Sequence, residues 1–299
     1  MGHNHKHGHH HTTENIKTAF FLNLAFTILE IIGGFYTNSL AIMSDAVHDL
    51  GDSLSLGMSW YFQKLSNKGA NKKYTYGYGR FSLLGAIINS IVLIVGSFFI
   101  ISAAIPRIIH PEEADATGMM WLAILGVIVN GAAVLKLKKG SSINERVVSL
   151  HLLEDVLGWV AVLIASIIMQ FWDVPILDPI LSLLIAGYVL FNVYKNIKDA
   201  FKIILQGVPN EISSDEIIQQ IILNIDEVAE VHDCHIWTLD GEFHIATIHI
   251  KIKSKGFSWQ KSKEIKEQIK KLLHDNFNLE HVTLELESIS EDCAYKDCN

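Results

Sequence analysis

Long apolar segments constrain this chain more than any other feature of its sequence. They follow one another through the first two thirds of the chain, and each has about the 20 residues that a helix needs to cross a bilayer. A mean hydropathy of +0.28 and an apolar content of 49% agree with a chain that lies largely in lipid. We expect six membrane-spanning helices, at residues 16–36, 40–62, 81–105, 118–137, 147–171 and 179–205.

The lysines and arginines between these segments predict the orientation of the helices. Two connections, residues 63–80 and 136–146, are rich in basic residues, whereas the other three carry few or none. Basic connections stay on the cytoplasmic side of a membrane. We therefore expect both termini in the cytoplasm of a cell-membrane protein. Because the amino end has no apolar signal segment, we expect the first helix to remain in the mature protein.

A soluble domain is expected after the last span, where a glycine and a proline at 207 and 209 break the helix. The pair Asp240-Gly241 predicts a hairpin between the first two strands of this domain. We expect a small α+β fold, with elements in the order helix, strand, strand, helix, strand at residues 213–225, 231–239, 243–253, 258–277 and 282–288.

The chain is thus expected to have four parts. Six histidines among the first eleven residues alternate with Asn, Lys and Gly, which is more typical of a native metal-binding tail, disordered without metal, than of a purification tag. The parts are a His-rich cytoplasmic tail (1–14), a six-helix transmembrane domain (15–207), a cytoplasmic α+β domain (208–290) and a cysteine-containing tail (291–299).

Two histidine–aspartate pairs lie inside the apolar segments. His48 and Asp52 are four residues apart in the second span, and His151 and Asp155 repeat this spacing in the fifth. Residues four apart share one face of a helix. An ionisable group inside the bilayer costs about 3 kcal/mol or more, so such groups mark functional sites. One pair alone could be a polar contact between packed helices, but two matching pairs predict a metal cage with four ligands.

This ligand set suits zinc, which prefers tetrahedral coordination by nitrogen, sulfur or carboxylate oxygen. A divalent ion balances the charge of two carboxylates, so the loaded cage would be neutral in the membrane. Protons compete with metal for the same groups. We therefore hypothesise that outgoing metal is exchanged for incoming protons.

Other polar residues of the first two spans have a less definite interpretation. Asp45 and Asp49 lie near the first pair, and we assign neither as a ligand, although Asp45 could orient a ligand imidazole or simply lie near the mouth of the helix. Asn23 and Glu30 share one face of the first span. Helix packing and a water path explain these two residues equally well.

These motifs resemble those of the cation diffusion facilitator family, in particular its bacterial CzcD-like zinc and cadmium efflux subgroup, over the whole length of the chain. The matching stretches are the His-rich start, NSLAIMSDAVHDLGDS, GYGRF, HLLEDVLGW with DPILS, and VHDCHIWTL. The resemblance implies that both histidine–aspartate pairs hold the transported ion, and that a histidine at position 48 accompanies zinc and cadmium rather than manganese. It also implies a homodimer, proton antiport, alternating access and a metallochaperone-like cytoplasmic domain. Some relatives bind metal through histidines in the second-to-third loop, but residues 63–79 contain none, so no such site is expected.

The resemblance also implies metal ligands in the cytoplasmic domain, namely His232, His249 and Glu287. The strand pattern supports part of this, because His249, Glu285 and Glu287 lie on polar faces of their strands, where a cluster could assemble. A solvated sheet face is the alternative interpretation.

Four further residues are weaker metal candidates. Cys234 and His235 adjoin the first histidine of the cytoplasmic set, and strand alternation allows only one of each neighbouring pair to share its face. Cys293 and Cys298 are more widely spaced than a zinc-ribbon pair, although some relatives use a similar terminal pair as ligands.

The most consistent function is efflux of zinc, with cadmium and cobalt as further substrates. A net charge of −8 disfavours a nucleic-acid partner, and three cysteines give no disulfide framework. A membrane metalloenzyme is disfavoured because the cage fills all four positions with protein ligands, whereas catalytic zinc keeps one open. A non-transporting metal sensor on the same scaffold is the remaining alternative, and the two intact pairs argue against it.

Overall fold

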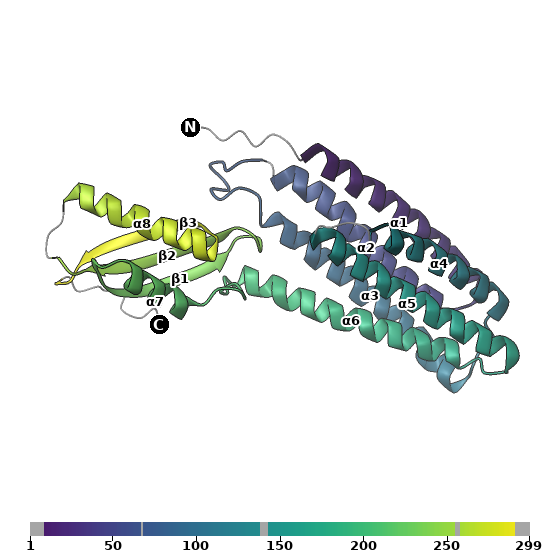
Figure 1. Cartoon of the computed structure of the whole chain (residues 1–299). Helices are drawn as coiled ribbons and strands as arrows, with labels where there is room; N and C mark the ends of the chain where they lie inside the picture. Colours follow the sequence, from purple (N-terminus) through teal and green to yellow (C-terminus); the bar gives the residue numbers. More distant parts are fainter. Residues whose placement is uncertain (1–8, 67, 138–142, 255–257, 291–299) are drawn as a thin grey trace. The chain divides into compact units, whose positions relative to one another are not determined.

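Six long helices account for the apolar part of the chain, as the sequence predicts. The computed structural model describes residues 9–66, 68–137, 143–254 and 258–290. The helices are α1 (His9–Thr37), α2 (Leu40–Ser66), α3 (Phe81–Ile109), α4 (Ala116–Leu137), α5 (Ile143–Phe171) and α6 (Leu177–Ile204) (Figure 1). Helix α1 begins at His9, earlier than the expected residue 16, because a helix elongates at little cost once an apolar segment has formed. Residues 1–8 of the His-rich tail lie outside the described residues.

Among the described residues, five of these helices are long and apolar enough to cross a membrane. Helix α2 does not meet the same measure, although its 27 residues are long enough for a span. The reason is its three aspartates, Asp45, Asp49 and Asp52, which lower its hydropathy. The least apolar of the six helices is therefore the one that carries the first histidine–aspartate pair.

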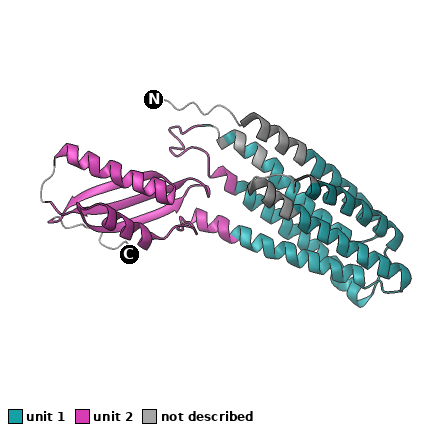
Figure 2. Ribbon diagram, viewed as in Figure 1, with its two compact units in different colours: residues 1–68, 84–197 teal, residues 69–83, 198–299 magenta. Residues whose placement is uncertain are grey.

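The described residues pack as two units (Figure 2). The first consists of the described residues within 1–68 and 84–197, and the second of those within 69–83 and 198–299. In the first unit α4 packs most extensively on α5, and α1 on α2. Trp159 of α5 is buried against Gly126 of α4, where a Cβ atom would come within 2.2 Å of the indole ring. Only glycine at position 126 allows α4 and α5 to approach this closely.

A buried aspartate at the start of α6 holds the start of α2. The carboxylate of Asp178 accepts hydrogen bonds from the Ser39 hydroxyl at 2.6 Å and from the backbone N–H groups of Leu40 and Ala41 at 2.8 and 3.1 Å. The first N–H groups of a helix have no partner within the helix, and a carboxylate both accepts from them and interacts favourably with the helix dipole. This cap fixes the helix that presents His48.

The second unit contains a three-stranded sheet with two helices on one face (Figure 1). Its elements are α7 (Ser214–Asn224), β1 (Val228–Thr238), β2 (His244–Ile252), α8 (Trp259–Phe277) and β3 (Leu279–Ser288). Strand β2 is central, antiparallel to β1 and parallel to β3. The predicted order of elements and the predicted hairpin are confirmed, and Gly241 in the hairpin turn adopts a φ of +107° that favours glycine.

The two faces of this sheet differ in chemistry. Alternate residues of β2, among them Ile248 and Ile250, are buried against Ile221 of α7 and Ile269 of α8. The residues between them, including His249, lie on the opposite face, which neither helix of the unit covers in the described residues. The apolar face stabilises the unit and leaves the polar face free to carry a site.

Candidate metal centres

The first cluster of metal-binding donors lies among the membrane helices. His48 and Asp52 come from α2 and Asp155 from α5, and one donor atom of each lies within 4.8 Å of the other two. The His48 Nε2 atom is 3.7 Å from Asp52 Oδ2 and 3.7 Å from Asp155 Oδ1. Ligand atoms of tetrahedral zinc are about 3.3 Å apart, given metal–ligand bonds of about 2 Å. These three residues, called here the membrane cluster, therefore need only a small contraction to share an ion.

The fourth expected donor of this site is His151. It belongs to α5 and precedes Asp155 by four residues, but its side chain lies outside the part of the chain that the structure describes. Asp45 and Asp49 are both buried on α2 with 5% exposure. Within the described residues, neither joins the group of donors that lie within 4.8 Å of one another. The structure thus separates the histidine–aspartate pair of α2 from the other two acids of that helix.

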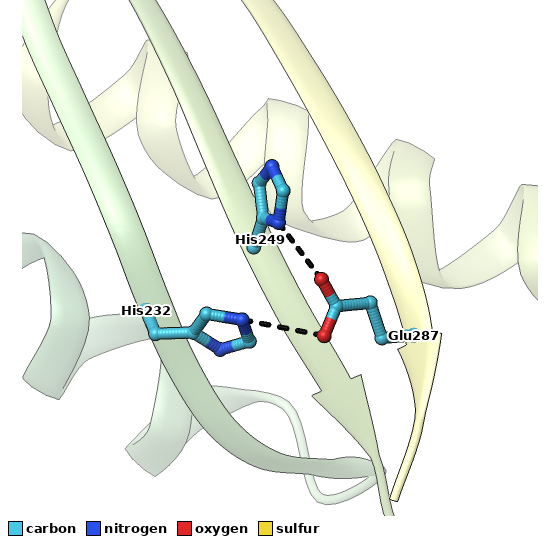
Figure 3. A group of neighbouring side chains, drawn as sticks. All are labelled: His232, His249 and Glu287. Atoms are coloured by element: carbon cyan, nitrogen blue, oxygen red, sulfur yellow. Dashed lines mark hydrogen bonds and ion pairs between the residues drawn. The ribbon is translucent and has the colours of Figure 1, made fainter. Parts of the chain in front are cut away.

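The second cluster lies on the polar face of the sheet. His232 of β1, His249 of β2 and Glu287 of β3 point toward one another (Figure 3). Glu287 Oε1 is 2.8 Å from His249 Nδ1, and Glu287 Oε2 is 3.2 Å from His232 Nε2. The two histidines are direct cross-strand partners, and their ring centroids are 5.6 Å apart. We call these three residues the sheet cluster.

The sheet cluster has the chemistry of a metal site. The side chains of His232 and Glu287 are 9% and 6% exposed, which is low for ionisable groups. The Nδ1 atom of His232 is buried, and no hydrogen-bond partner for it is found in the part of the chain that the structure describes. Its Nε2 atom lies 3.2 Å from Glu287 Oε2 without the alignment of a hydrogen bond. Buried polar atoms are normally satisfied. Two imidazoles and a carboxylate fit zinc, which would satisfy a nitrogen of His232.

A β-bulge next to His232 determines which neighbouring residues reach the sheet cluster. The pairing of β1 with β2 shifts between His232 and His235, and Asp233 inside the bulge adopts a φ of +45°. Its carboxylate lies 3.5 Å from His249 Nε2 and 2.9 Å from His235 Nε2. Asp233 is absent from the sequence prediction, because regular alternation does not reveal the position of a bulge.

The weaker metal-ligand candidates lie at the edge of the sheet cluster, against the apolar core, or outside the described residues. Glu285 lies 3.4 Å from His249 Nε2, but its side chain is 66% exposed, at the edge of the sheet cluster. Cys234 packs against the apolar core instead, and burial together with the Asp233 carboxylate raises the pKa of its thiol to about 11. Metal binds the thiolate form of cysteine, and burial against the core disfavours that form. Cys293 and Cys298 lie outside the described residues.

Family models match both parts of the chain. Residues 16–205 match a model described as the cation efflux transmembrane domain. Residues 211–289 match a model described as the cytoplasmic domain of the cation efflux protein.

Curated relatives match along nearly their whole length. A Bacillus velezensis protein named "Cadmium, cobalt and zinc/H(+)-K(+) antiporter" is 34% identical over 292 residues, which cover 96% of this chain and 92% of the relative. The "Metal cation efflux system protein CzcD" of Cupriavidus metallidurans is 32% identical over 290 residues, which cover 96% and 90%. The "Zinc transporter ZitB" of Pectobacterium atrosepticum is 31% identical over 290 residues, which cover 96% and 89%.

Proposed function

This chain belongs to the cation efflux family, the cation diffusion facilitators, and from that premise we propose that it exports zinc from the cytoplasm in exchange for protons, with cadmium and cobalt as further substrates. The family is one of multi-pass membrane transporters, not of enzymes. The names of the relatives include transport of all three metals. We place both termini in the cytoplasm, as the basic connections suggest.

The membrane cluster is the observation that carries this proposal. His48, Asp52 and Asp155 converge from two helices of an otherwise apolar bundle, where ionisable groups are costly unless they have a function. We propose that these residues, together with His151, hold the transported ion. A divalent cation neutralises the two carboxylates, so the metal-loaded site carries no net charge in the low-dielectric interior of the membrane.

Proton coupling is proposed from the same groups. Imidazole and carboxylate bind metal only when deprotonated, so a metal that leaves the membrane cluster is replaced by protons at the acidic side of the membrane. The name of the Bacillus velezensis relative includes H(+) among its exchanged ions, which supports this coupling.

We propose that the sheet cluster binds a regulatory zinc ion. Its three donors come from three different strands, so an ion held by His232, His249 and Glu287 would link the strands on the open face of the sheet. The ion would neutralise the Glu287 carboxylate and hold the three strands together, and we assign it no part in translocation. The protein is proposed to act as a homodimer, and the cytoplasmic unit would then report the metal concentration to the transport domain.

The test is metal uptake by everted membrane vesicles, in which export appears as accumulation in the lumen. An imposed gradient with an acidic lumen is expected to drive zinc accumulation, and a protonophore is expected to abolish it. Accumulation that ignores the gradient contradicts proton exchange. Vesicles that accumulate none of zinc, cadmium and cobalt contradict transport itself and favour the sensor alternative.

A further inference from the structure

Helix α2 has a second polar face besides the one that carries the membrane cluster. Asp45, Asp49 and Ser53 recur every four residues and are buried, with exposures of 5%, 5% and 1%. The side-chain amide of Asn23 in α1 donates to the Asp49 carbonyl oxygen and to Ser53 Oγ, both at 3.1 Å. The part of this face at Asp49 and Ser53 therefore packs against α1, while the Asp45 carboxylate also reaches toward Gly158 of α5. We call Asn23 and Glu30 of α1 together with Asp45, Asp49 and Ser53 of α2 the α1–α2 seam.

Glu30 is the ionisable residue that α1 contributes to the seam, and the proposed transport chemistry does not use it. It lies two turns after Asn23 in α1 and is 0% exposed. Within the described residues, neither Oε1 nor Oε2 has a hydrogen-bond partner. It shares a face of α1 with Asn23, whose amide bonds to α2, and the ionisable residues on that face of α2 are the buried acids Asp45 and Asp49. Helix α4, which also packs on α1, has no ionisable residue between positions 116 and 135.

A carboxylate in these surroundings is unfavourable, because it is desolvated and faces other carboxylates rather than a cation. Protonation of the Glu30 carboxylate removes its charge and with it this unfavourable electrostatic energy. Neutral Glu30 can donate a hydrogen bond to the neighbouring Asp49 carboxylate, whereas two ionised carboxylates can only repel each other. The position of Glu30 therefore defines a binding site for one proton within the seam.

The seam and the membrane cluster are coupled electrostatically. Two donors of the membrane cluster, His48 and Asp52, belong to the same helix as Asp49 of the seam, so the two groups of charges lie side by side along α2. A divalent cation bound beside Asp155 acts on Glu30 with the opposite sign and so favours its ionised form. Metal in the membrane cluster thus opposes the proton on Glu30 without contact between them.

We propose that Glu30 is a proton-carrying residue of the exchange, separate from the metal ligands: it holds a proton while the membrane cluster is empty and releases it when a divalent cation binds. This inference rests on the proposed exchange of metal for protons. The proton that leaves Glu30 passes to water on the side from which the metal entered, and a proton from the opposite side replaces it after the metal departs.

The experiment counts protons released per zinc ion bound by the full-length protein in detergent, using a pH indicator in weakly buffered solution. The Glu30→Gln variant keeps the size of the side chain and cannot ionise, so it is expected to bind zinc and to release about one proton fewer than the unaltered protein. Thr27→Val is the matched control, because Thr27 is equally buried one turn away and its hydroxyl bonds only to the Asn23 carbonyl oxygen among the described contacts. Its proton count is expected not to change. The sheet cluster contributes equally to all three proteins, so the difference reports Glu30.

Equal proton release by Glu30→Gln and the unaltered protein would overturn the proposal. So would a folded Glu30→Gln protein that no longer binds zinc at the membrane cluster, because Glu30 would then be a ligand. Infrared difference spectra of the unaltered protein give a test that needs no variant: a protonated carboxyl absorbance at neutral pH should decrease when zinc is added, and its absence would also overturn the proposal. An unaltered protein that releases no protons on binding zinc would instead refute the proposed exchange itself.

Discussion

Replacing Asp155 with asparagine is expected to weaken zinc binding at the membrane cluster by about a hundredfold. The other two described donors of this cluster, His48 and Asp52, both come from α2, so Asp155 is the donor that links α5 to the ion. Its Oδ1 atom lies 3.7 Å from His48 Nε2. The Asp155→Asn variant keeps the shape of the side chain and removes its charge.

The magnitude follows from charge balance. With two carboxylates a divalent ion gives a neutral site, whereas with one carboxylate the loaded site carries a net positive charge inside the membrane. Such a charge costs about 3 kcal/mol. Since each 1.4 kcal/mol changes an equilibrium constant about tenfold, the expected loss of affinity is about two orders of magnitude.

The assay is gradient-driven zinc uptake by everted vesicles over a range of zinc concentrations. Asp155→Asn is expected to raise the concentration for half-maximal uptake and to abolish the protection of a zinc-sensitive host. Glu154→Gln is the matched control, because it removes the same charge from the adjacent, exposed position of α5. An Asp155→Asn protein with the uptake curve of the control would refute the assignment of the membrane cluster as the transport site.

Three further predictions concern other parts of the molecule. Burial, and after it the Asp233 carboxylate, raise the pKa of the Cys234 thiol from its ordinary value of 9.0 to about 11, so alkylation of this thiol should stay slow until the pH approaches 11. The neutral buried thiol stabilises the fold fully below pH 9.0, and this contribution is lost as the pH rises through 11. A protein with both tail cysteines changed to serine isolates the signal, and rapid alkylation at neutral pH would contradict the burial. Glu287→Gln should lower the zinc affinity of the sheet cluster by roughly tenfold or more in calorimetric titration, and Glu285→Gln, at a side chain that is 66% exposed, should change it little. Equal losses in the two variants would contradict the assignment of Glu287 as a ligand. Asp178→Asn should destabilise the membrane unit by about 1 kcal/mol in thermal unfolding in detergent, because it removes the charge that caps α2. Asp173→Asn, in the exposed connection before α6, should have no effect, and identical melting of the two variants would count against the cap.

The fold could be predicted largely from the sequence because its signals are local. Apolar segments of membrane length give the six helices, and strand alternation with the turn at Asp240-Gly241 gives the cytoplasmic sheet. The ends of the elements are less exact. Strand β3 begins at Leu279 rather than at the expected residue 282, because its pairing with β2 extends the strand beyond its alternating pattern.

The candidate sites depend more on tertiary contacts. The bulge at Asp233 brings this carboxylate toward His249 and leaves Cys234 against the apolar core, an outcome that regular alternation from His232 does not specify. Glu285 and Glu287 share a strand face, yet only Glu287 is buried between the two histidines. Cross-strand register and the bulge decide this difference, and neither is encoded in the residue types themselves.

The sequence by itself determined which residues could share a helix face, because the helical repeat fixes the relation of His48 to Asp52 regardless of how the helices pack. Only the tertiary structure decided what those faces meet. It placed Asp155 of α5 near one face of α2 and Asn23 of α1 against another, so that one helix takes part in both the proposed metal site and the proposed proton site. The physical reason is that side-chain periodicity is a property of the backbone, whereas the approach of two helices depends on the packing of every residue between them.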